Sequence, residues 1–368
     1  YAAATATGGP TAYTVNKSEG GTWSVDLTGL TERQYTLQAV AVDDVGNSRT
    51  STAVTFNVDL TNPTASIASN RGARTRQTTA TFTVTNADPD SDANPDADPP
   101  VDGPKTASGV NTVMCQLDGG PASNCSSPIT YGSETALTEG PHTVTASVTD
   151  VAGNTYTTSY PFVVDVTAPT VSITSPLDGS ATKDTTPTVT MTVGTATGDP
   201  STLTLNVYTG GSVSGTPVAV TVNKVLGAWL VDLATLDQGL YTLQAVATDD
   251  VGNSRSSTAV TFNVDTTDPT ATVDSNRGTR TKQQSTTITV TPSDPDPDAA
   301  GAATPSGVDT VECKLDSGEY ADCISGITYG SVTPLAQGTY TVTAKVTDRA
   351  GNVSTTPYTF TVDLTAPS

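Results

Sequence analysis

An internal repeat is the feature that most constrains how this 368-residue chain can fold. Residues 35–41 recur without change at 241–247, which is 206 positions later. Residues 45–59 recur at 251–265 with a single Thr-to-Ser change. Repetition at a fixed period is typical of arrays of small structural units, so we expect the function to reside in the array.

The hydrophobic pattern predicts strands. In residues 340–347 every second residue is apolar, which indicates a strand with one buried and one wet face. Residues 358–362 repeat the alternation after a turn at Gly351, so the two segments predict a hairpin. Residues 23–27 and 229–233 alternate in the same way, and no long window has the 3.6-residue period of a helix. The fold class predicted is all-β.

Two kinds of unit, called module A and module B, alternate along the chain. The predicted modules are A1 (residues 1–63), B1 (64–169), A2 (170–269) and B2 (270–368). Module A1 lines up only with the later part of module A2, because no residues before Tyr1 match residues 170–207. A sandwich without its first strands exposes an apolar face and an unpaired edge. We hypothesise that strands from another chain complete it; the alternative is a boundary of the sequence inside a module.

Each module B carries a pair of cysteines ten positions apart. The pairs stand in equivalent places, Cys115 with Cys125 and Cys313 with Cys323. Four cysteines allow three connectivities, and the local one is the simplest. Zinc is the rival, but two cysteines without a nearby histidine do not complete a four-ligand site. Two local disulfides are therefore predicted, which indicates an oxidising compartment.

The charge of the chain limits its partners. The net charge is −21, from 16 basic and 37 acidic residues. This balance argues against a nucleic-acid partner, whose phosphates need neutralising, and favours solubility and attraction for cations. No stretch approaches the ~20 apolar residues of a membrane span, and the first six residues lack the pattern of a signal peptide.

The motifs of both modules resemble a known family. Module A2 has Gly-x-Trp-x-Val-x-Leu at 227–233 and Leu-x-x-Gly-x-Tyr-Thr-Leu at 236–243. Module B1 has Cys-x-Leu-Asp-Gly at 115–119, and module B2 has Ser in place of the final Gly. These patterns resemble the bacterial immunoglobulin-like repeats of large surface adhesins. The resemblance implies tandem immunoglobulin-like β-sandwiches and an extracellular or cell-surface location.

The sequence offers little for catalysis. His142 is the only histidine, and the other modules place Tyr35, Tyr241 and Tyr340 at the equivalent position. A tyrosine there commonly ties a sandwich corner through its hydroxyl, so we expect His142 to take that role. With no second histidine and no Gly-rich phosphate loop, we predict that the chain is not an enzyme and has no catalytic or cofactor-binding residues.

We predict that the chain requires no cofactor. Its aspartates nevertheless offer two candidate places for calcium. The acidic run 88–98 fails the EF-hand pattern, since Ala93 and Pro99 replace its Gly and Glu, and so does the run 294–298. Both runs are interpreted as solvated loops. The better candidates recur in the turns and linkers at the ends of modules, where ordinary turn chemistry is the alternative. They are Asp43, Asp59, Asp150, Asp165, Asp249, Asp265, Asp348 and Asp363.

These observations favour a structural array over a catalyst. We predict a repeat array of an extracellular bacterial surface protein that acts as an adhesin stalk or filament subunit. The expected partners are copies of itself or adjoining repeats of the same chain. The alternative is a module that binds a surface glycan or protein, and exposed aromatic residues clustered on one face would favour it.

Overall fold

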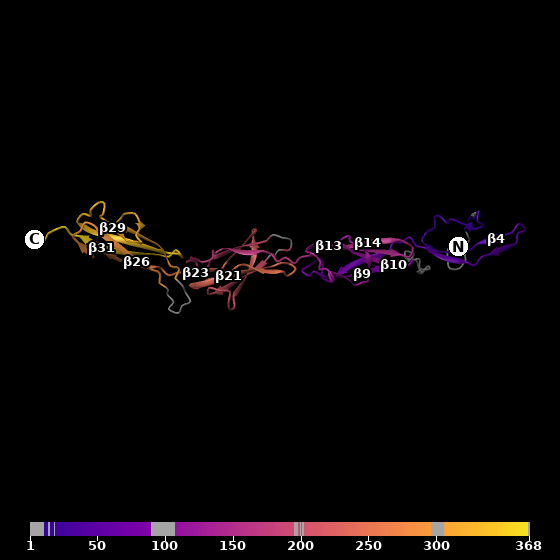
Figure 1. Cartoon of the computed structure of the whole chain (residues 1–368), viewed down its shortest axis with the longest axis horizontal. Helices are drawn as coiled ribbons and strands as arrows, with labels where there is room; N and C mark the ends of the chain where they lie inside the picture. Colours follow the sequence, from indigo (N-terminus) through magenta and orange to yellow (C-terminus); the bar gives the residue numbers. More distant parts are fainter. Residues whose placement is uncertain are drawn as a thin grey trace, which may run out of the picture. The chain divides into compact units, whose positions relative to one another are not determined.

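The computed structural model describes residues 11–13, 15–17, 19–89, 107–194, 198, 200, 202–295 and 305–366. Every regular element in this part is a β-strand (Figure 1), which confirms the all-β prediction. Among these residues no helix is long and apolar enough to cross a membrane. The chain divides into two compact units, Tyr1–Thr167 and Ala168–Ser368.

In the first unit, residues 11–63 form three separate two-stranded sheets. The strands pair as β1 (Asn16–Lys17) with β2 (Trp23–Ser24), β3 (Arg33–Leu37) with β6 (Val54–Val58), and β4 (Val40–Val42) with β5 (Ser48–Thr50). The strand predicted over 23–27 is therefore only two residues long here. Residues 1–10, at the start of predicted module A1, lie outside the described part.

The rest of the first unit is a sandwich of two antiparallel sheets with one short parallel edge strand. The larger sheet has the order β11 (Ser123–Asn124), β10 (Val110–Leu117), β13 (Gly140–Asp150), β14 (Thr155–Val164), β8 (Arg74–Thr75). The smaller has the order β12 (Ile129–Tyr131), β9 (Ala80–Ala87), β7 (Thr64–Ser69). Phe82 from the small sheet packs with Phe162 from the large one, their ring centroids 5.1 Å apart.

In the second unit, residues 171–264 form one sheet system of nine strands. Its order is β15 (Val171–Ser175), β17 (Thr188–Val193), β20 (Ala228–Asp232), β19 (Val218–Val225), β18 (Thr202–Thr209), β21 (Gly239–Thr248), β23 (Val260–Val264), β16 (Ser180–Thr182), with β22 (Ser254–Ser256) also on β21. Its core includes Leu205, Trp229, Leu243 and Phe262.

Residues 270–362 repeat the sandwich of residues 64–164. The larger sheet has the order β25 (Arg280–Thr281), β31 (Val353–Val362), β30 (Gly338–Asp348), β27 (Val308–Leu315), β28 (Ala321–Asp322). The smaller has the order β24 (Thr270–Ser275), β26 (Thr286–Ser293), β29 (Ile327–Tyr329). The hairpin predicted from alternation is β30–β31. No described sheet crosses a predicted module boundary, but the division into four modules stays a prediction.

The structure contains both local disulfides that the cysteine spacing predicted. Cys115 joins Cys125 and Cys313 joins Cys323, in equivalent places. Cys115 and Cys313 lie in the buried cores of their sandwiches. Closing a loop of this length removes about 3 kcal/mol of chain entropy from the unfolded state. Each sandwich with a disulfide thus supplements its small core with a covalent link.

His142 takes the place of the corner tyrosine, as predicted. The hydroxyls of Tyr35, Tyr241 and Tyr340 each donate to the backbone carbonyl oxygen four residues earlier, at 3.0–3.1 Å. His142 Nε2 donates in the same way to the Thr138 carbonyl oxygen at 2.8 Å. The imidazole also stacks on a phenylalanine ring, as the three tyrosines do.

Candidate metal centres at the strand ends

Three aspartates from different parts of the first unit converge at the ends of strands. Asp59 follows β6, Asp88 follows β9, and Asp150 is the last residue of β13. One carboxylate oxygen of each lies within 4.8 Å of the others. The sequence suggested that Asp150 converges with the linker aspartate Asp165, whereas the structure brings Asp150 together with the preceding linker aspartate Asp59 and with Asp88. We call these three residues the first aspartate cluster.

Local hydrogen bonds orient the carboxylates of the first cluster. Asp150 Oδ1 accepts from the backbone N–H groups of Gly153 and Asn154 at 2.6 and 2.8 Å, so the turn closes on its own aspartate. Asp59 Oδ2 accepts from the Ser108 N–H at 2.7 Å. The Asn154 amide donates to both the Asp150 carboxylate and the Asp59 carbonyl oxygen. The turn after β13 is therefore tied to the linker after β6.

The second unit contains an equivalent cluster of Asp265, Asp294 and Asp348, again within 4.8 Å. Asp265 follows β23, Asp294 follows β26, and Asp348 ends β30. The Asn352 amide donates to the Asp265 carbonyl oxygen at 2.8 Å and to the Asp348 carboxylate at 2.8 Å. The same arrangement therefore occurs twice in the chain.

A lysine strengthens the junction in the second unit. The Lys183 ammonium donates to the Gly351 carbonyl oxygen at 2.9 Å, and its backbone N–H donates to the Ala350 carbonyl oxygen at 3.2 Å. Lys183 follows β16, whereas the two carbonyl groups belong to the turn between β30 and β31. These bonds join residues 171–264 to the sandwich of residues 270–362 at the cluster.

Both clusters gather carboxylates in buried positions. Asp59, Asp150, Asp265 and Asp348 are buried, with at most 6% of their surface exposed. Burial raises the pKa of Asp294, and the neighbouring carboxylates of Asp265 and Asp348 raise it further against the opposing hydrogen bonds. Ionised carboxylates at such sites are costly unless a cation or donors compensate them.

One carboxylate oxygen in each cluster is left over. The Oδ2 atoms of Asp88 and Asp294 each accept from a glycine N–H at 2.6 Å, but both Oδ1 atoms are buried without a hydrogen-bond partner. Buried carboxylate oxygens are the ligands that Ca²⁺ prefers, and it takes six to eight oxygens in adaptable geometry. The donor sets therefore fit a hard divalent cation.

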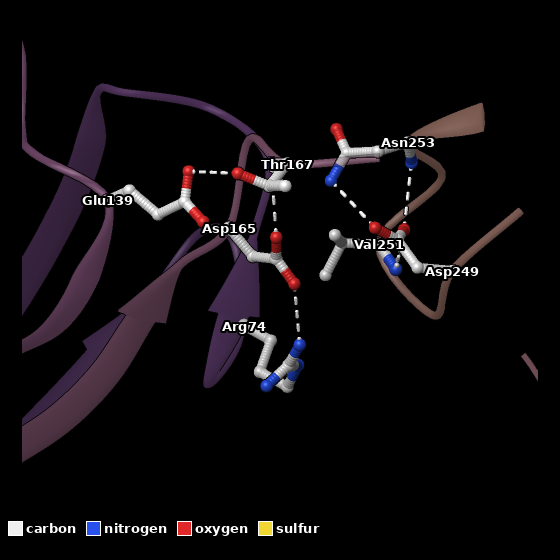
Figure 2. A network of polar contacts seen from close by, with 7 residues as sticks. All are labelled: Arg74, Glu139, Asp165, Thr167, Asp249, Val251 and Asn253. Atoms are coloured by element: carbon white, nitrogen blue, oxygen red, sulfur yellow. Dashed lines mark hydrogen bonds and ion pairs between the residues drawn. The ribbon is translucent and has the colours of Figure 1, made fainter. Parts of the chain in front are cut away.

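The aspartates that follow the sandwiches of residues 64–164 and 270–362 pair with arginine instead. In the first unit Arg74 Nη2 lies 2.8 Å from Asp165 Oδ2, with both side chains mostly buried (Figure 2). The backbone N–H of Thr167 donates to the other oxygen of Asp165, and the Thr167 hydroxyl donates to Glu139 (Figure 2). In the second unit Arg280 pairs with Asp363 at 3.2 Å. These carboxylates are neutralised by arginine rather than gathered with other carboxylates.

One strand position contributes to this difference. Thr75 pairs with Val164, and Thr182 pairs with Val264, each between parallel strands. The Thr75 carbonyl oxygen accepts from the Asp165 N–H, and the Thr182 carbonyl oxygen accepts from the Asp265 N–H. The preceding residue is Arg74 in one case and Ala181 in the other. Asp265 therefore has alanine where Asp165 has arginine.

The residue directly after one strand determines whether a third carboxylate is present. Asp88 follows β9 and Asp294 follows β26, whereas Gly194 follows the equivalent strand β17. The sequence signal for the third ligand was thus an aspartate directly after a strand, followed by proline in both copies. It was overlooked because both aspartates were considered only as parts of an EF-hand-like run. Residues 90–98 and 296–298 of those runs lie outside the described part.

The remaining candidates close their own turns. Asp249 accepts from the N–H groups of Val251 and Asn253 and from the Asn253 amide (Figure 2). Asp43 makes equivalent bonds, and hydrogen bonds from the Asn47 amide and N–H lower its pKa against the opposing effect of burial. Within the described residues the structure gathers neither of these, nor Asp165 or Asp363, into a carboxylate cluster.

Two family profiles match the chain. A profile described as "Bacterial Ig-like domain" matches residues 2–61, 172–266 and 269–364, which is more than half of the chain. A second profile with the same description matches residues 120–166. No curated protein matches the sequence.

Several solved structures are similar to parts of the chain at low sequence identity. A tetra-tandem repeat from the extending region of a large adhesion protein is 19% identical and covers 95% of this chain and 91% of its own, with a TM-score of 0.31. Part of a 1.5-MDa bacterial ice-binding adhesin is 18% identical over 82% and 98%, with a TM-score of 0.36. Fibronectin(III)-like modules of Clostridium thermocellum CbhA are 18% identical over 52% and 92%, with a TM-score of 0.32.

Proposed function

The chain belongs to the bacterial Ig-like domain family, and we propose that it is a non-enzymatic structural array, a stalk or filament segment of an extracellular adhesin. The repeated sandwiches and the two disulfides support this role, because disulfides persist in oxidising compartments outside the cytosol. The acidic surface would keep such an array hydrated and its copies apart.

The two aspartate clusters carry the proposal. Each lies where predicted module A continues into module B, and each links residues from both modules. A divalent cation held by Asp59, Asp88 and Asp150, or by Asp265, Asp294 and Asp348, would neutralise buried charge and fasten the junction. The arginine-paired linkers after Val164 and Val362 would not need a cation. Stiffness would then depend on calcium only at the A-to-B junctions.

Calcium titration of the full chain tests this role. We expect Ca²⁺ to bind at two sites and to raise the unfolding temperature, because it binds only the folded junctions. The Asp294→Asn variant should lose one of the two sites, measured by titration calorimetry. Asp363→Asn is the matched control and should keep both.

A second variant separates charge from structure. Ala181→Arg should give Asp265 the partner that Asp165 already has, so the second site should lose calcium while the sandwiches stay folded. If calcium does not bind, or if Asp294→Asn binds two equivalents, the cation part of the proposal is wrong.

The proposal also concerns how copies of the chain assemble. Residues 11–63 carry an apolar face that no described strand covers, and we propose that strands of another polypeptide add to it. Such addition would join polypeptides end to end. Concentration-dependent association that disappears in Val54→Asp would support it, since Val54 is exposed and its substitution need not disturb the fold.

The alternative of a glycan- or protein-binding module has less support. The exposed aromatic side chains among the described residues are Tyr13, Trp23 and Tyr156. Tyr13 and Trp23 lie within residues 11–63. The described part of either large sandwich therefore offers no cluster of exposed aromatic residues for a ligand.

A further inference from the structure

Each predicted module contains the same contact between the linker that follows it and the loop before its corner residue. The loop residue three positions before the corner residue is Glu or Gln in every copy, and its side chain accepts a hydrogen bond from the hydroxyl of a linker threonine. We call this contact the linker clasp. The pairs are Glu32 with Thr61, Glu139 with Thr167, Gln238 with Thr267, and Gln337 with Thr365.

The clasp holds one oxygen of the linker aspartate. In all four copies the N–H of the clasp threonine donates to Oδ1 of the aspartate two residues earlier, at 3.0–3.3 Å. The threonine is therefore bound through its hydroxyl to the loop and through its N–H to the aspartate. Hydrogen bonds of this kind fix the orientation of a carboxylate, so the second oxygen points in a restricted direction.

In two of the linkers the second oxygen meets an arginine. Figure 2 shows the arrangement at Asp165, where Glu139 binds the Thr167 hydroxyl and Arg74 lies beside Oδ2 of the aspartate. The same oxygen of Asp363 also pairs with an arginine in the second unit. The clasp thus directs the carboxylate toward its charged partner.

In the aspartate clusters the second oxygen reaches into the following predicted module. Oδ2 of Asp59 accepts from the Ser108 N–H, and Oδ2 of Asp265 accepts from the Ser306 N–H, both at 2.7 Å. Each of these aspartates contributes a carboxylate oxygen to its cluster. We infer that the clasp sets the position of both aspartates, which makes its acceptor side chain a positioning residue for the cation. The inference rests on the proposed function for the presence of that cation.

The clasp needs an oxygen acceptor and no donor. Gln238 Oε1 accepts from the hydroxyls of Thr266 and Thr267 at 3.0 and 2.9 Å, whereas its buried Nε2 has no hydrogen-bond partner among the described residues. In the first unit Glu32 takes this position, and both of its carboxylate oxygens lie 2.8 Å from the Thr61 hydroxyl oxygen. A carboxylate should therefore replace the Gln238 amide without losing a hydrogen bond.

Gln337 offers a matched control for Gln238. It accepts from the Thr365 hydroxyl at 3.0 Å, but Asp363 belongs to no carboxylate cluster within the described residues. Removing either amide should remove a similar hydrogen bond, whereas only Gln238 holds the linker of a cation site. A difference between the two variants therefore reports positioning rather than the loss of local structure.

The first measurement is calcium binding to the full chain by titration calorimetry. The parent for this series carries Asp88→Asn, which leaves only the second site. We expect Gln238→Met to bind calcium about 2- to 12-fold more weakly, as the loss of one neutral hydrogen bond implies, and Gln337→Met to bind it as the parent does. Gln238→Glu should match or exceed the affinity of the parent, because the acceptor remains and the added negative charge attracts the cation.

The second measurement needs no calcium. Amide hydrogen exchange at Ser306 reports the bond from its N–H to Asp265, and residue-resolved mass spectrometry follows it in metal-free buffer. We expect this exchange to accelerate in Gln238→Met by a similar factor and to stay unchanged in Gln337→Met and Gln238→Glu. Thr267→Val removes a donor hydroxyl instead and provides the same test if Gln238→Met does not fold.

The two measurements separate this inference from the proposed function. If the parent binds no calcium, the cation part of the proposed function is wrong, and exchange at Ser306 alone decides the inference. Equal exchange in Gln238→Met and Gln337→Met overturns the inference, as does a calcium affinity that Gln238→Met leaves unchanged. Effects that occur in Gln238→Met and are absent from Gln238→Glu support it.

Discussion

Because His142 stands where the other sandwiches have a corner tyrosine, we expect the stability of its sandwich to depend on pH. His142 is 7% exposed, and its Nδ1 lies 2.7 Å from Asp118 Oδ2 while Nε2 donates to the Thr138 carbonyl oxygen. Burial acts to lower the pKa of His142, but the Thr138 carbonyl and the Asp118 carboxylate together raise it above its ordinary value of 6.5. The protonated imidazole donates from both nitrogens, which satisfies both partners.

The direction of the pH effect follows from that raised pKa. A group whose pKa is higher in the folded state than in the unfolded state stabilises the fold fully below pH 6.5. The contribution is lost as the pH rises through the folded-state pKa. The sandwich of residues 64–164 should therefore be more stable at pH 5 than at pH 8. The sandwich with Tyr340 has no histidine and serves as an internal reference.

Replacing His142 with phenylalanine gives the magnitude. Hydrogen bonds to charged groups are worth about 1.5–3 kcal/mol, and Asp118 keeps its bond from the Thr143 N–H. At pH 5 we expect the variant to be destabilised by that amount, which corresponds to about 10- to 150-fold faster amide exchange over residues 140–164. His142→Tyr should recover about 1 kcal/mol through the Thr138 carbonyl and remove the pH dependence.

Hydrogen exchange measured by mass spectrometry resolves both sandwiches in one molecule. The ratio of protection in residues 140–164 to that in residues 338–362 cancels the effect of pH on intrinsic exchange. We expect this ratio to fall between pH 5 and pH 8 in the native chain and to stay constant in His142→Tyr. A constant ratio in the native chain, or the same fall in the variant, would refute the reasoning.

Five further substitutions, in three tests, probe the packing, the ion pairs and one tight turn. Trp229→Ala should cost about 3–5 kcal/mol in denaturant unfolding because the ring is buried, whereas Trp23→Ala should cost almost nothing; equal costs would contradict the assigned exposure. Arg74→Ala should destabilise more than Arg280→Ala, which loses about 0–1 kcal/mol as an exposed pair, and the reverse order in thermal melts would count against the electrostatic assignment. Gly132→Ala should impair folding, because its φ is +89° and the added Cβ would lie 2.1 Å from a backbone carbonyl oxygen; an unchanged melting temperature would show that the turn can move.

Strand alternation, cysteine spacing and the shared corner position predicted much of the fold. They were sufficient for the hairpin β30–β31, the two disulfides and the role of His142, because each depends on residues close in sequence. The short strand β2 was predicted too long. Its counterpart β20 pairs with β17, and no described strand takes the place of β17 beside β2.

The aspartate clusters could be predicted only in part. The recurrence of turn and linker aspartates predicted that such residues converge, but the pair expected was Asp150 with Asp165, and the structure instead places Asp150 beside Asp59. The third member, Asp88, comes from a strand that only the tertiary fold brings to that end. The arginine pairing of Asp165 was equally hidden, because Arg74 lies 91 residues away in sequence and reaches the linker through the parallel pair of β8 and β14.

The two kinds of junction have a consequence for how a gene encoding such an array can lengthen. A linker like Asp265 meets Asp294 and Asp348 only if a module B follows it, since module A2 has Gly194 at the position of Asp294. Duplicating module A alone would place that aspartate beside an incomplete set of carboxylates. Duplicating an A–B pair keeps every junction intact. Recombination that preserves stability should therefore proceed in pairs, which is the period at which residues 35–41 recur.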